Sequence, residues 1–343
     1  MIQFPLDEVA RSDERARATE DLKTEREGHE MARHPRPRKR HGSVVCSRKV
    51  AAPAQSRSRD RTPLSPSHDR PVNPQQWRDA MQTWALPESI LAAAPESPWG
   101  FPIEPFRTRV ERAKPGDLSF ANRRALEALP EHGTVLDIGV GSGAASLPLH
   151  PRCSLIVGVD ASAALLAEFR RQARRVGAGA RTVRGTWPDV QRRTPVADVV
   201  VCNHVVYNVG DLAPFALALH RRARQRVVLE LTRRHPTSWM ADLWLRFHDL
   251  ERPVRPDAAD AFSLLRGLGL PVRRRSASSD RGAGGFSRRE DAVASIRRRL
   301  CLDASRDPEV AEALGDRLVH ADALWAVRPP SQPIVTLWWD VGE

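Results

Sequence analysis

The chain has 343 residues, of which 41% are hydrophobic, so it is long enough to bury a substantial core in one large domain or two smaller ones. No run of eighteen apolar residues occurs and the acidic N-terminal stretch lacks an apolar signal region, which excludes a membrane span and a secretory signal and predicts a cytoplasmic protein. The net charge of +12 is compatible with a nucleic-acid partner, so the position of the charge matters more than its sum.

Most of the surplus charge lies near the N-terminus. Residues 31–70 hold eleven Lys and Arg against two Asp, and they are rich in Pro and Ser and poor in large apolar side chains. Such a stretch cannot bury enough surface to fold, so residues 1–72 are predicted to be a disordered basic leader. Because no aromatic residue interleaves these basic residues for base stacking, we expect a solvated tail or translated sequence upstream of the natural start, with nucleic-acid binding as the alternative.

The following segment, about 73–130, is predicted to be an N-terminal helical cap. Trp77, Met81 and Trp84 recur at helical spacing, and a further helix is expected at about 119–129. A Pro-punctuated stretch between them brings three aromatic residues within a short distance along the chain: Trp99, Phe101 and Phe106. These residues indicate either packing across the edge of the main domain or a lid over a ligand pocket.

Strands and helices then alternate. Five short apolar runs are predicted to be strands: 134–140, 154–160, 181–185, 197–205 and 226–232. The clearest helix lies between the second and third, with Ser162 as its N-cap, Gly177 at its end and an apolar face that includes Val176. Its arginines fall on the opposite, solvated face. This alternation predicts a doubly wound, mainly parallel sheet.

The C-terminal part continues the pattern. Residues 237–250 form a helical face of core residues, 257–269 a capped helix, and 270–278 a sixth strand. Two helices are expected over 287–314, before a last strand at 334–340, and their arginines are interpreted as solvated charge, with an anionic substrate as the alternative. Residues 73–343 are therefore predicted to be one domain.

In a doubly wound sheet, ligands bind at the carboxyl ends of the strands. The first strand is followed by Gly139, Gly141 and Gly143, which allow a tight turn and bring backbone N–H groups to a ligand at a helix N-terminus. Asp160 ends the second strand, at a spacing suited to a carboxylate that accepts both hydroxyls of a ribose. The later strand ends add further candidates: Thr186, Trp187, Asn203, His204, Tyr207, Asn208, Glu230, Thr232 and His235.

The glycines alone do not identify the cofactor, because they also satisfy the dinucleotide fingerprint of NAD sites. Asp137 distinguishes the two hypotheses, since it lies inside the first strand, where a dinucleotide fold has an apolar residue. A carboxylate there suits the ammonium group of S-adenosylmethionine. The alternative role of Asp137 is to accept hydrogen bonds from the amides of the glycine loop.

At these residues the sequence resembles the class I S-adenosylmethionine-dependent methyltransferases. Three stretches look like motifs of that family: "VLDIGVGSG" (135–143), "VGVDAS" (157–162) and "ADVVVCNHVVYNV" (197–209). The resemblance runs from about residue 75 to the C-terminus. It implies a Rossmann-like fold of seven strands in which "IVTLWWD" (334–340) is reversed and lies between the fifth and the sixth.

A narrower resemblance, to an uncharacterised bacterial group of these enzymes, rests on "LPESILAAAPESPWGFP", "VLELTRRHPTSW", "RRRLCL" and the final "LWWD". The group implies a fold and a cofactor but no substrate. The family implies that Asp137, Gly139, Gly141 and Gly143 cradle the methionine end of S-adenosylmethionine. The family also implies Asp160 at the ribose and Thr186 and Trp187 at the adenine, and Ala161 and Asn203 are further candidates for cofactor contacts. Val140 departs from the small or Cys residue usual in the family, which bears on affinity more than on fold.

Methyl transfer requires little of the protein beyond alignment, exclusion of water and, for some acceptors, removal of a proton. His204 is the first candidate for that base, because it follows the fourth strand and titrates near neutrality. Alternatively, His204 is a hydrogen-bonded residue in the wall of the site or a residue that contacts the cofactor. His235, Tyr207 and Glu230 are further candidates.

The acceptor is predicted by exclusion. "CNHVVYN" lacks the Asn-Pro-Pro-Tyr-like motif of enzymes that methylate amino groups of adenine or glutamine, and no Pro-Cys nucleophile supports cytosine chemistry. We therefore expect a small molecule that accepts the methyl group on oxygen or nitrogen. An RNA methyltransferase, a non-catalytic cofactor-binding module and an NAD-dependent oxidoreductase are the alternatives. The four cysteines show no C-x-x-C pairing, so no structural metal is expected, and the sequence does not indicate an oligomeric state.

Overall fold

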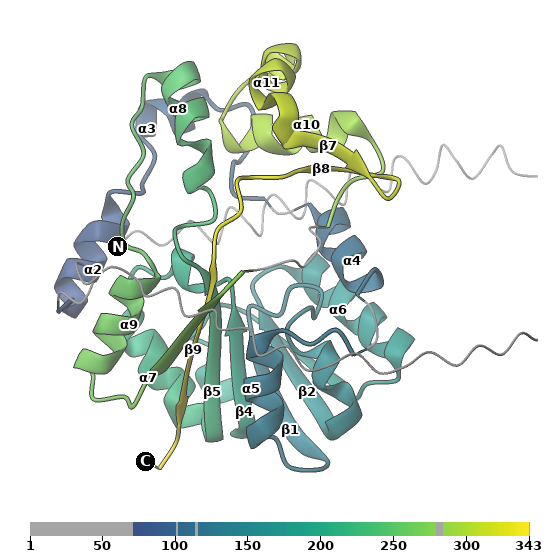
Figure 1. Cartoon of the computed structure of the whole chain (residues 1–343), viewed down its shortest axis with the longest axis vertical. Helices are drawn as coiled ribbons and strands as arrows, with labels where there is room; N and C mark the ends of the chain where they lie inside the picture. The colour runs from purple at the N-terminus through teal and green to yellow at the C-terminus, as the bar shows by residue number, and fades with distance from the viewer. Residues whose placement is uncertain (1–70, 101, 114–115, 279–283, 343) are drawn as a thin grey trace, which may run out of the picture.

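The computed structural model describes residues 71–100, 102–113, 116–278 and 284–342, and its centre is a seven-stranded sheet (Figure 1). The leader predicted over 1–72 lies outside the described residues except for Pro71 and Val72. The strand order is β3-β2-β1-β4-β5-β9-β6. The strands are β1 (Gly133–Ile138), β2 (Cys153–Asp160), β3 (Ala180–Arg184), β4 (Ala197–Asn203), β5 (Ala223–Thr232), β6 (Arg273–Ala277) and β9 (Ile334–Asp340).

The direction of the last strand agrees with the prediction. Strands β1 to β5 all run in the same direction, whereas β9 is antiparallel to both β5 and β6. The five parallel strands end at the upper edge of the sheet in Figure 1. The strand order reverses between β1 and β4, and ligands of doubly wound sheets bind at the carboxyl ends of the strands at such a point.

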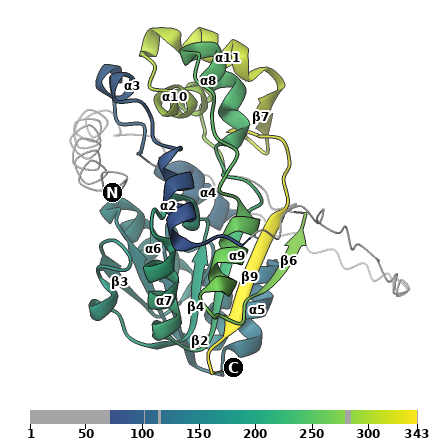
Figure 2. The same cartoon turned by 90° about the vertical axis from the view of Figure 1, so that its left-hand side faces the viewer.

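Helices cover both faces of the sheet, as the alternating pattern predicts (Figure 2). On one face, α5 (Phe120–Ala128) and α6 (Ala163–Val176) contribute to one apolar cluster. On the other, α2 (Pro74–Gln82), α7 (Leu212–Arg222) and α9 (Ala258–Gly267) contribute to a second. The predicted helices at 119–129, 162–177 and 257–269 are confirmed, with Ser119, Ser162 and Asp257 as their N-caps.

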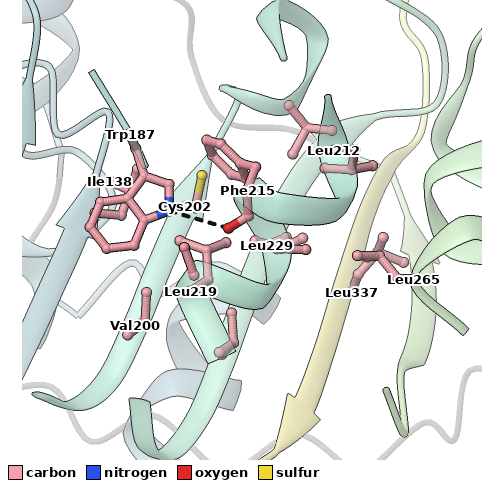
Figure 3. Packing of buried hydrophobic residues seen from close by; sticks show 14 of the residues in the cluster. Ile138, Trp187, Val200, Cys202, Leu212, Phe215, Leu219, Leu229, Leu265 and Leu337 are labelled. Atoms are coloured by element: carbon pink, nitrogen blue, oxygen red, sulfur yellow. Dashed lines mark hydrogen bonds between the residues drawn. The ribbon is translucent and has the colours of Figure 1, made fainter. Parts of the chain in front are cut away.

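Side chains of the strands alternate between these clusters. Leu136 and Ile138 of β1 belong to the cluster beneath α7, whereas Val135 belongs to the cluster beneath α5 and α6. Figure 3 shows Phe215 and Leu219 of α7 packed in the first cluster. Fully burying one such side chain contributes about 2 kcal/mol, so this period of two is what holds each strand in register.

One detail of α6 differs from the prediction. Its arginines are exposed as expected, but Val176, predicted on the apolar face, is 40% exposed. Val176 is the last residue of the helix, next to Gly177, which ends it at a φ of +74°. The chain therefore turns away before this side chain can pack.

Above the carboxyl ends of the strands lies a cap with its own apolar cluster (Figure 1). It comprises α3 (Glu88–Ala93), α8 (Ala241–His248), α10 (Arg289–Arg299), α11 (Asp307–Leu314) and the hairpin β7 (Leu318–Ala321) and β8 (Leu324–Val327). The two helices predicted over 287–314 are confirmed. The hairpin was not predicted, because each strand has four residues and Asp322 and Ala323 take positive φ in its turn instead of the usual Asn-Gly.

The helices of the described ranges are all too short or too polar to cross a membrane. One further helix, α4 (Ile103–Glu111), lies beside α6 and reaches the loop that follows β1.

Candidate active site

The loop after β1 requires glycine at three positions. Gly139, Gly141 and Gly143 have φ values of +72°, +53° and +93°, in the region that side chains rarely adopt. A side chain at Gly139 would also overlap Val205 Cγ2. The Gly139 and Val140 amides donate to the Val159 carbonyl at 2.8 and 3.0 Å, which ties the loop to β2.

The element that follows the loop differs from the prediction. A helix N-terminus was expected behind the glycines, but the chain forms a short 3-10 helix, Leu147–Arg152, and enters β2 at Cys153. Pro148 and Pro151 lie in this segment, and a proline removes a backbone donor that an α-helix needs. The loop amides therefore do not gain the dipole of an α-helix.

Asp137 lies inside β1, beneath this loop. Its side chain is fully buried, and neither carboxylate oxygen has a hydrogen-bond partner among the residues that the structure describes. Burial, reinforced by the charge of Asp160, raises the pKa of Asp137 to about 7, while the nearby Ser146 works in the opposite direction without making a hydrogen bond of normal geometry. A buried carboxylate in this state fits a cationic group.

Asp160 ends β2 beside the glycine loop. Its Oδ2 accepts the Gly141 amide at 3.0 Å and its Oδ1 accepts the Ser162 amide at 2.9 Å. Each carboxylate oxygen can accept more than one hydrogen bond, so these bonds orient the side chain and leave acceptor capacity. Asn203 ends the adjacent β4, and its buried Oδ1 has no hydrogen-bond partner within the described part of the chain. Ala161 follows Asp160 directly.

Thr186 and Trp187 follow β3 but lie in different surroundings. Thr186 is half-buried, whereas Trp187 is buried in the cluster beneath α7. The Trp187 indole Nε1 donates to the Phe215 carbonyl at 3.2 Å, as Figure 3 shows. The indole is therefore anchored in the core, with Thr186 next to it at the end of the strand.

His204 and Glu230 come together at the ends of β4 and β5. The register pairs Asn203 with Glu230, and the His204 amide donates to the Glu230 carbonyl at 2.7 Å. His204 Nε2 lies 3.5 Å from Glu230 Oε1, and Glu230 is buried while the histidine is one-third exposed. His204 has a φ of +60°, a strained conformation that is concentrated at functional sites. The pair is arranged as an imidazole oriented by a carboxylate.

The hydroxyl of Tyr207 is hydrogen-bonded to the end of β5. Its hydroxyl lies 2.7 Å from Thr232 Oγ1 and accepts the Thr232 amide. Burial raises the pKa of Tyr207 well above its usual value, which makes loss of its proton unfavourable. Its position indicates that it supports the turn after β4.

His235 is buried above the end of β5. Its ring stacks on Trp84 at 4.1 Å between centroids, and its Nδ1 accepts the Thr237 amide at 3.2 Å. Burial, together with the charges of Arg252 and Arg299, lowers the pKa of His235 to about 3. The imidazole is therefore neutral at pH 7.

The N-terminal helical segment covers the glycine loop. The Phe106 ring of α4 lies 3.3 Å from the position that a Cβ on Gly141 would take, and Ser142 Oγ donates to the Phe106 carbonyl at 2.8 Å. Of the three aromatic residues predicted to bury together, Phe101 lies outside the described residues. The position of Phe106 favours the lid over mere edge packing.

Arg252 and Arg299 were not predicted as site residues. Arg252 donates to the Trp84 carbonyl at 2.6 Å, and its guanidinium lies over the Trp84 and Trp244 rings at 5.4 and 5.3 Å. Arg299 ends α10 in the cap. No motif marks either residue, and their charges contribute, after burial, to the lowered pKa of His235.

The prediction that the arginines of 287–314 are solvated charge is wrong for Arg297. This residue is 8% exposed and pairs with Glu96 and Asp307 at 2.8 and 2.9 Å. In the sequence, the apolar residues Ile296 and Leu300 on either side of these arginines were the signal that this part of the helix is buried in the cap.

No group of three or more His, Cys, Asp or Glu side chains that suits a metal ion occurs among the residues described.

Part of the chain matches a known family model. Residues 136–229 match the family model described as "Methyltransferase domain". A search of curated proteins found no matching relative.

Three of the solved structures with detectable similarity cover between 52% and 65% of this chain. The YcgJ protein from Bacillus subtilis is 16% identical over 65% of this chain and 98% of its own, with a TM-score of 0.42. Magnesium protoporphyrin IX methyltransferase from Synechocystis PCC 6803, with bound SAH, is 19% identical over 52% of this chain and 89% of its own, with a TM-score of 0.38. Geranyl diphosphate C-methyltransferase from Streptomyces coelicolor A3(2) is 16% identical over 64% of this chain and 76% of its own, with a TM-score of 0.38.

The matched segment runs from β1 to β5 and contains the glycine loop, Asp160 and His204. The sheet order, with one reversed strand between β5 and β6, is that expected from the resemblance in the sequence. Residues 136–229, from β1 to β5, are therefore a methyltransferase domain.

Proposed function

We propose that this enzyme transfers the methyl group of S-adenosylmethionine to an oxygen or nitrogen atom of a small molecule, and that the cofactor binds against the glycine loop. The observation that carries the proposal is the Asp137 carboxylate, fully buried beneath three glycines and without a hydrogen-bond partner in the described structure. An ammonium group is the natural partner of such a carboxylate, and nicotinamide cofactors have none.

The remaining cofactor contacts follow from the ends of the strands. Asp137 and Asn203, which both have buried oxygens without a hydrogen-bond partner in the described residues, take the methionine end. Asp160 keeps acceptor capacity for the ribose hydroxyls, with Ala161 beside it. Thr186 borders the adenine, and Trp187 supports it from the core.

Cofactor binding displaces Phe106 in this proposal. The phenyl ring lies against Gly141, and Val205 lies against Gly139, so both occupy the side of the loop that the cofactor needs. Helix α4 is tied there by the hydrogen bond from Ser142 to the Phe106 carbonyl. Movement of α4 then opens the site and closes it again over the bound cofactor, which excludes water.

S-adenosylmethionine supplies a methyl carbon on a sulfonium, which is ready for in-line displacement. A lone pair of the acceptor oxygen or nitrogen forms the new bond to the methyl carbon while the carbon–sulfur bond breaks and its electrons stay on sulfur. His204 Nδ1 takes the proton that the acceptor loses, because Nε2 faces Glu230 Oε1 at 3.5 Å, and the Glu230 carboxylate stabilises the resulting imidazolium. The buried His235 and Tyr207 shape the wall of the site.

A small acceptor is favoured by the cap. The cap that carries α8 and α10 lies over the carboxyl ends of the strands in Figure 1, and His204, which follows β4 at that end, is one-third exposed. A base beneath such a cap favours a compact acceptor over a folded polymer.

The cofactor assignment is tested by calorimetry of the full chain with S-adenosylmethionine and, separately, with NAD. We expect saturable binding of S-adenosylmethionine alone, and Asp160→Ala abolishes it. Asp198→Ala is the matched control, because Asp198 starts β4 at the opposite edge of the sheet, where it accepts the Thr134 amide. Binding of NAD, or unchanged affinity in Asp160→Ala, contradicts the assignment.

The role of His204 is tested with labelled S-adenosylmethionine and a cell extract separated into small molecules, RNA and protein. We expect label in the small-molecule fraction. His204→Gln lowers the rate by about a hundredfold or more with unchanged cofactor affinity. His150→Gln, at the amino end of β2, is the control and leaves the rate unchanged. Label in RNA or protein contradicts the small-molecule acceptor, and an unchanged rate in His204→Gln contradicts its role as a base.

A further inference from the structure

Helix α4, which covers the glycine loop, is bonded at two positions to the segment that leads into the cap helix α10. Thr108 Oγ1 donates to the Gly285 carbonyl at 3.1 Å and accepts the Gly285 amide at 3.0 Å. Glu104 Oε1 accepts both the amide and the hydroxyl of Ser287 at 2.8 Å. These bonds join parts of the chain that are 177 and 183 residues apart, so they connect the cover of the glycine loop with the cap.

Glycine at positions 284 and 285 makes this close approach possible. A Cβ on Gly284 would fall 1.7 Å from the Pro105 carbonyl oxygen, and a Cβ on Gly285 would fall 2.7 Å from the Trp325 carbonyl oxygen. Protein Cβ atoms do not approach a backbone oxygen so closely, so a side chain does not fit at either position. The segment is therefore held between the backbones of α4 and β8.

The β7–β8 hairpin is attached both to α4 and to this segment. Phe286 and Trp325 exchange two backbone hydrogen bonds of 2.7 Å, which adds residue 286 to the edge of β8. At the end of α4, Arg112 donates to the Asp322 carbonyl in the turn of the hairpin, and its guanidinium lies 3.8 Å from the Asp322 carboxylate. The hairpin therefore contacts α4 directly at the end of the helix and through residues 284–287 along its length.

The contacts of α4 with the core are of a kind that can yield. Arg171 of α6 pairs with Glu111 at 2.7 Å, but the Arg171 side chain is 44% exposed, and water weakens such a pair. The Phe106 ring occupies the side of the glycine loop that the cofactor needs, and the Phe106 carbonyl accepts one hydrogen bond there, from Ser142. Val110, which packs against the cluster beneath α5 and α6, is only partly buried. Helix α4 therefore leaves the loop more easily than it leaves the segment before α10.

We propose that α4, residues 284–287 and the β7–β8 hairpin form one moving body, the α4–hairpin unit, so that cofactor binding at the glycine loop shifts the hairpin and the start of α10. The inference rests on the proposed function, in which the cofactor displaces Phe106, and it adds that this displacement is passed to the cap. Because a coupling between two sites acts in both directions, the cofactor and an acceptor beneath the cap then change each other's affinity. The hairpin thus links occupancy of the cofactor site to the shape of the acceptor side.

The movement is measured by hydrogen–deuterium exchange of the full chain with and without S-adenosylhomocysteine, the cofactor product of methyl transfer, as the probe. In the wild type we expect the probe to change the exchange rates of the amides at the glycine loop, 139–143, and at the hairpin, 318–327. The double variant Glu104→Ala/Thr108→Val removes the side-chain bonds to the segment before α10. In this variant we expect the change at the loop to remain and the change at the hairpin to be lost.

Two control variants separate the coupling from other effects. Thr194→Val makes the same substitution before the amino end of β4, where the threonine hydroxyl donates to the Gln191 carbonyl at 2.7 Å, and it should keep both changes. Glu111→Ala breaks the pair with Arg171 and frees the α4–hairpin unit from α6. We expect both changes to remain in this variant, and calorimetry to show about threefold tighter binding of S-adenosylhomocysteine, because a contact that opposes the movement is gone.

A wild-type hairpin that does not respond when the glycine loop does overturns the inference, and so does a hairpin response that survives in the double variant. Loss of the hairpin response in Thr194→Val as well would attribute it to general destabilisation and would also overturn the inference. If the double variant no longer binds the probe, Glu104→Ala and Thr108→Val are measured singly, and an undiminished hairpin response in both has the same meaning. Absence of S-adenosylhomocysteine binding by the wild type would instead overturn the proposed function, so the two failures are distinguishable.

Discussion

Replacement of Asp137 by Asn tests the central feature of the site. The carboxyl has a pKa of about 7 in the folded protein against 3.8 for the free side chain, because burial disfavours the charged form. Between these two values the folded state holds a proton that the unfolded state has released. The free energy of unfolding therefore falls as pH rises through this window, and the full cost is present above about pH 7.

The magnitude follows from the difference in pKa. A difference of about 3 corresponds to ~4 kcal/mol of unfavourable free energy at neutral and alkaline pH in the cofactor-free protein. Asp137→Asn removes this cost but buries an amide without partners, a penalty of about 1–3 kcal/mol that does not depend on pH. We expect the stability of the variant relative to the wild type to rise by ~4 kcal/mol between about pH 4 and about pH 8.

The assay is urea unfolding at several pH values, with calorimetry of S-adenosylmethionine alongside. At about pH 8 the variant should bind the cofactor at least about tenfold more weakly, because the ammonium group loses its charged partner. Asp198→Asn is the control. Its pKa is lowered, despite opposing burial, mainly by hydrogen bonds from Thr134, so its stabilisation is present above pH 3.8 and is lost as pH falls through the lowered value. That variant should lose most stability at high pH, the opposite sign.

An equal change in the stability of Asp137→Asn at acidic and alkaline pH would mean that the Asp137 carboxyl titrates normally in the folded protein, which contradicts the raised pKa. Unchanged affinity for S-adenosylmethionine would refute the assignment of Asp137 to the ammonium group, even if the pH dependence is as expected. The two results separate burial of the carboxylate from its role in binding.

Three further substitutions test the local geometry, each by thermal unfolding. Gly139→Ala should lower the free energy of unfolding by about 1–3 kcal/mol, because the φ of Gly139 is positive and an added Cβ overlaps Val205. The double variant Gly139→Ala/Val205→Ala should recover part of the loss. Equal stability of the wild type, the single variant and the double variant would contradict the geometry of the loop. Tyr207→Phe should cost about 1 kcal/mol through the lost bond to Thr232 yet keep methyl transfer, and an inactive but folded variant would make Tyr207 more than a support. Ser162→Ala removes the N-cap of α6 at a cost of about 1 kcal/mol, whereas an unchanged melting temperature would mean that the cap contributes nothing.

Much of the sheet could be predicted from the sequence because its signals are local. Apolar runs of strand length, a serine N-cap at Ser162 and a glycine C-cap at Gly177 mark the elements within a few residues of their observed bounds. The motif residues Asp137 and Asp160 were also predictable, since each stands at a set distance from the glycines. The β7–β8 hairpin was missed because its turn, Asp322 and Ala323, lacks the residues usual at positive φ.

What the sequence alone determined is the class of fold, the order of its elements and the glycine loop with its two carboxylates, since these follow from periodicity and spacing along the chain. The tertiary structure alone decided that Phe106 covers the loop, that His204 meets Glu230, and that Trp84 contacts both His235 and Arg252. Those contacts join segments that are distant in the chain. They depend on which side chains are buried together, and a local pattern does not specify burial because the same residues are solvated in one fold and enclosed in another.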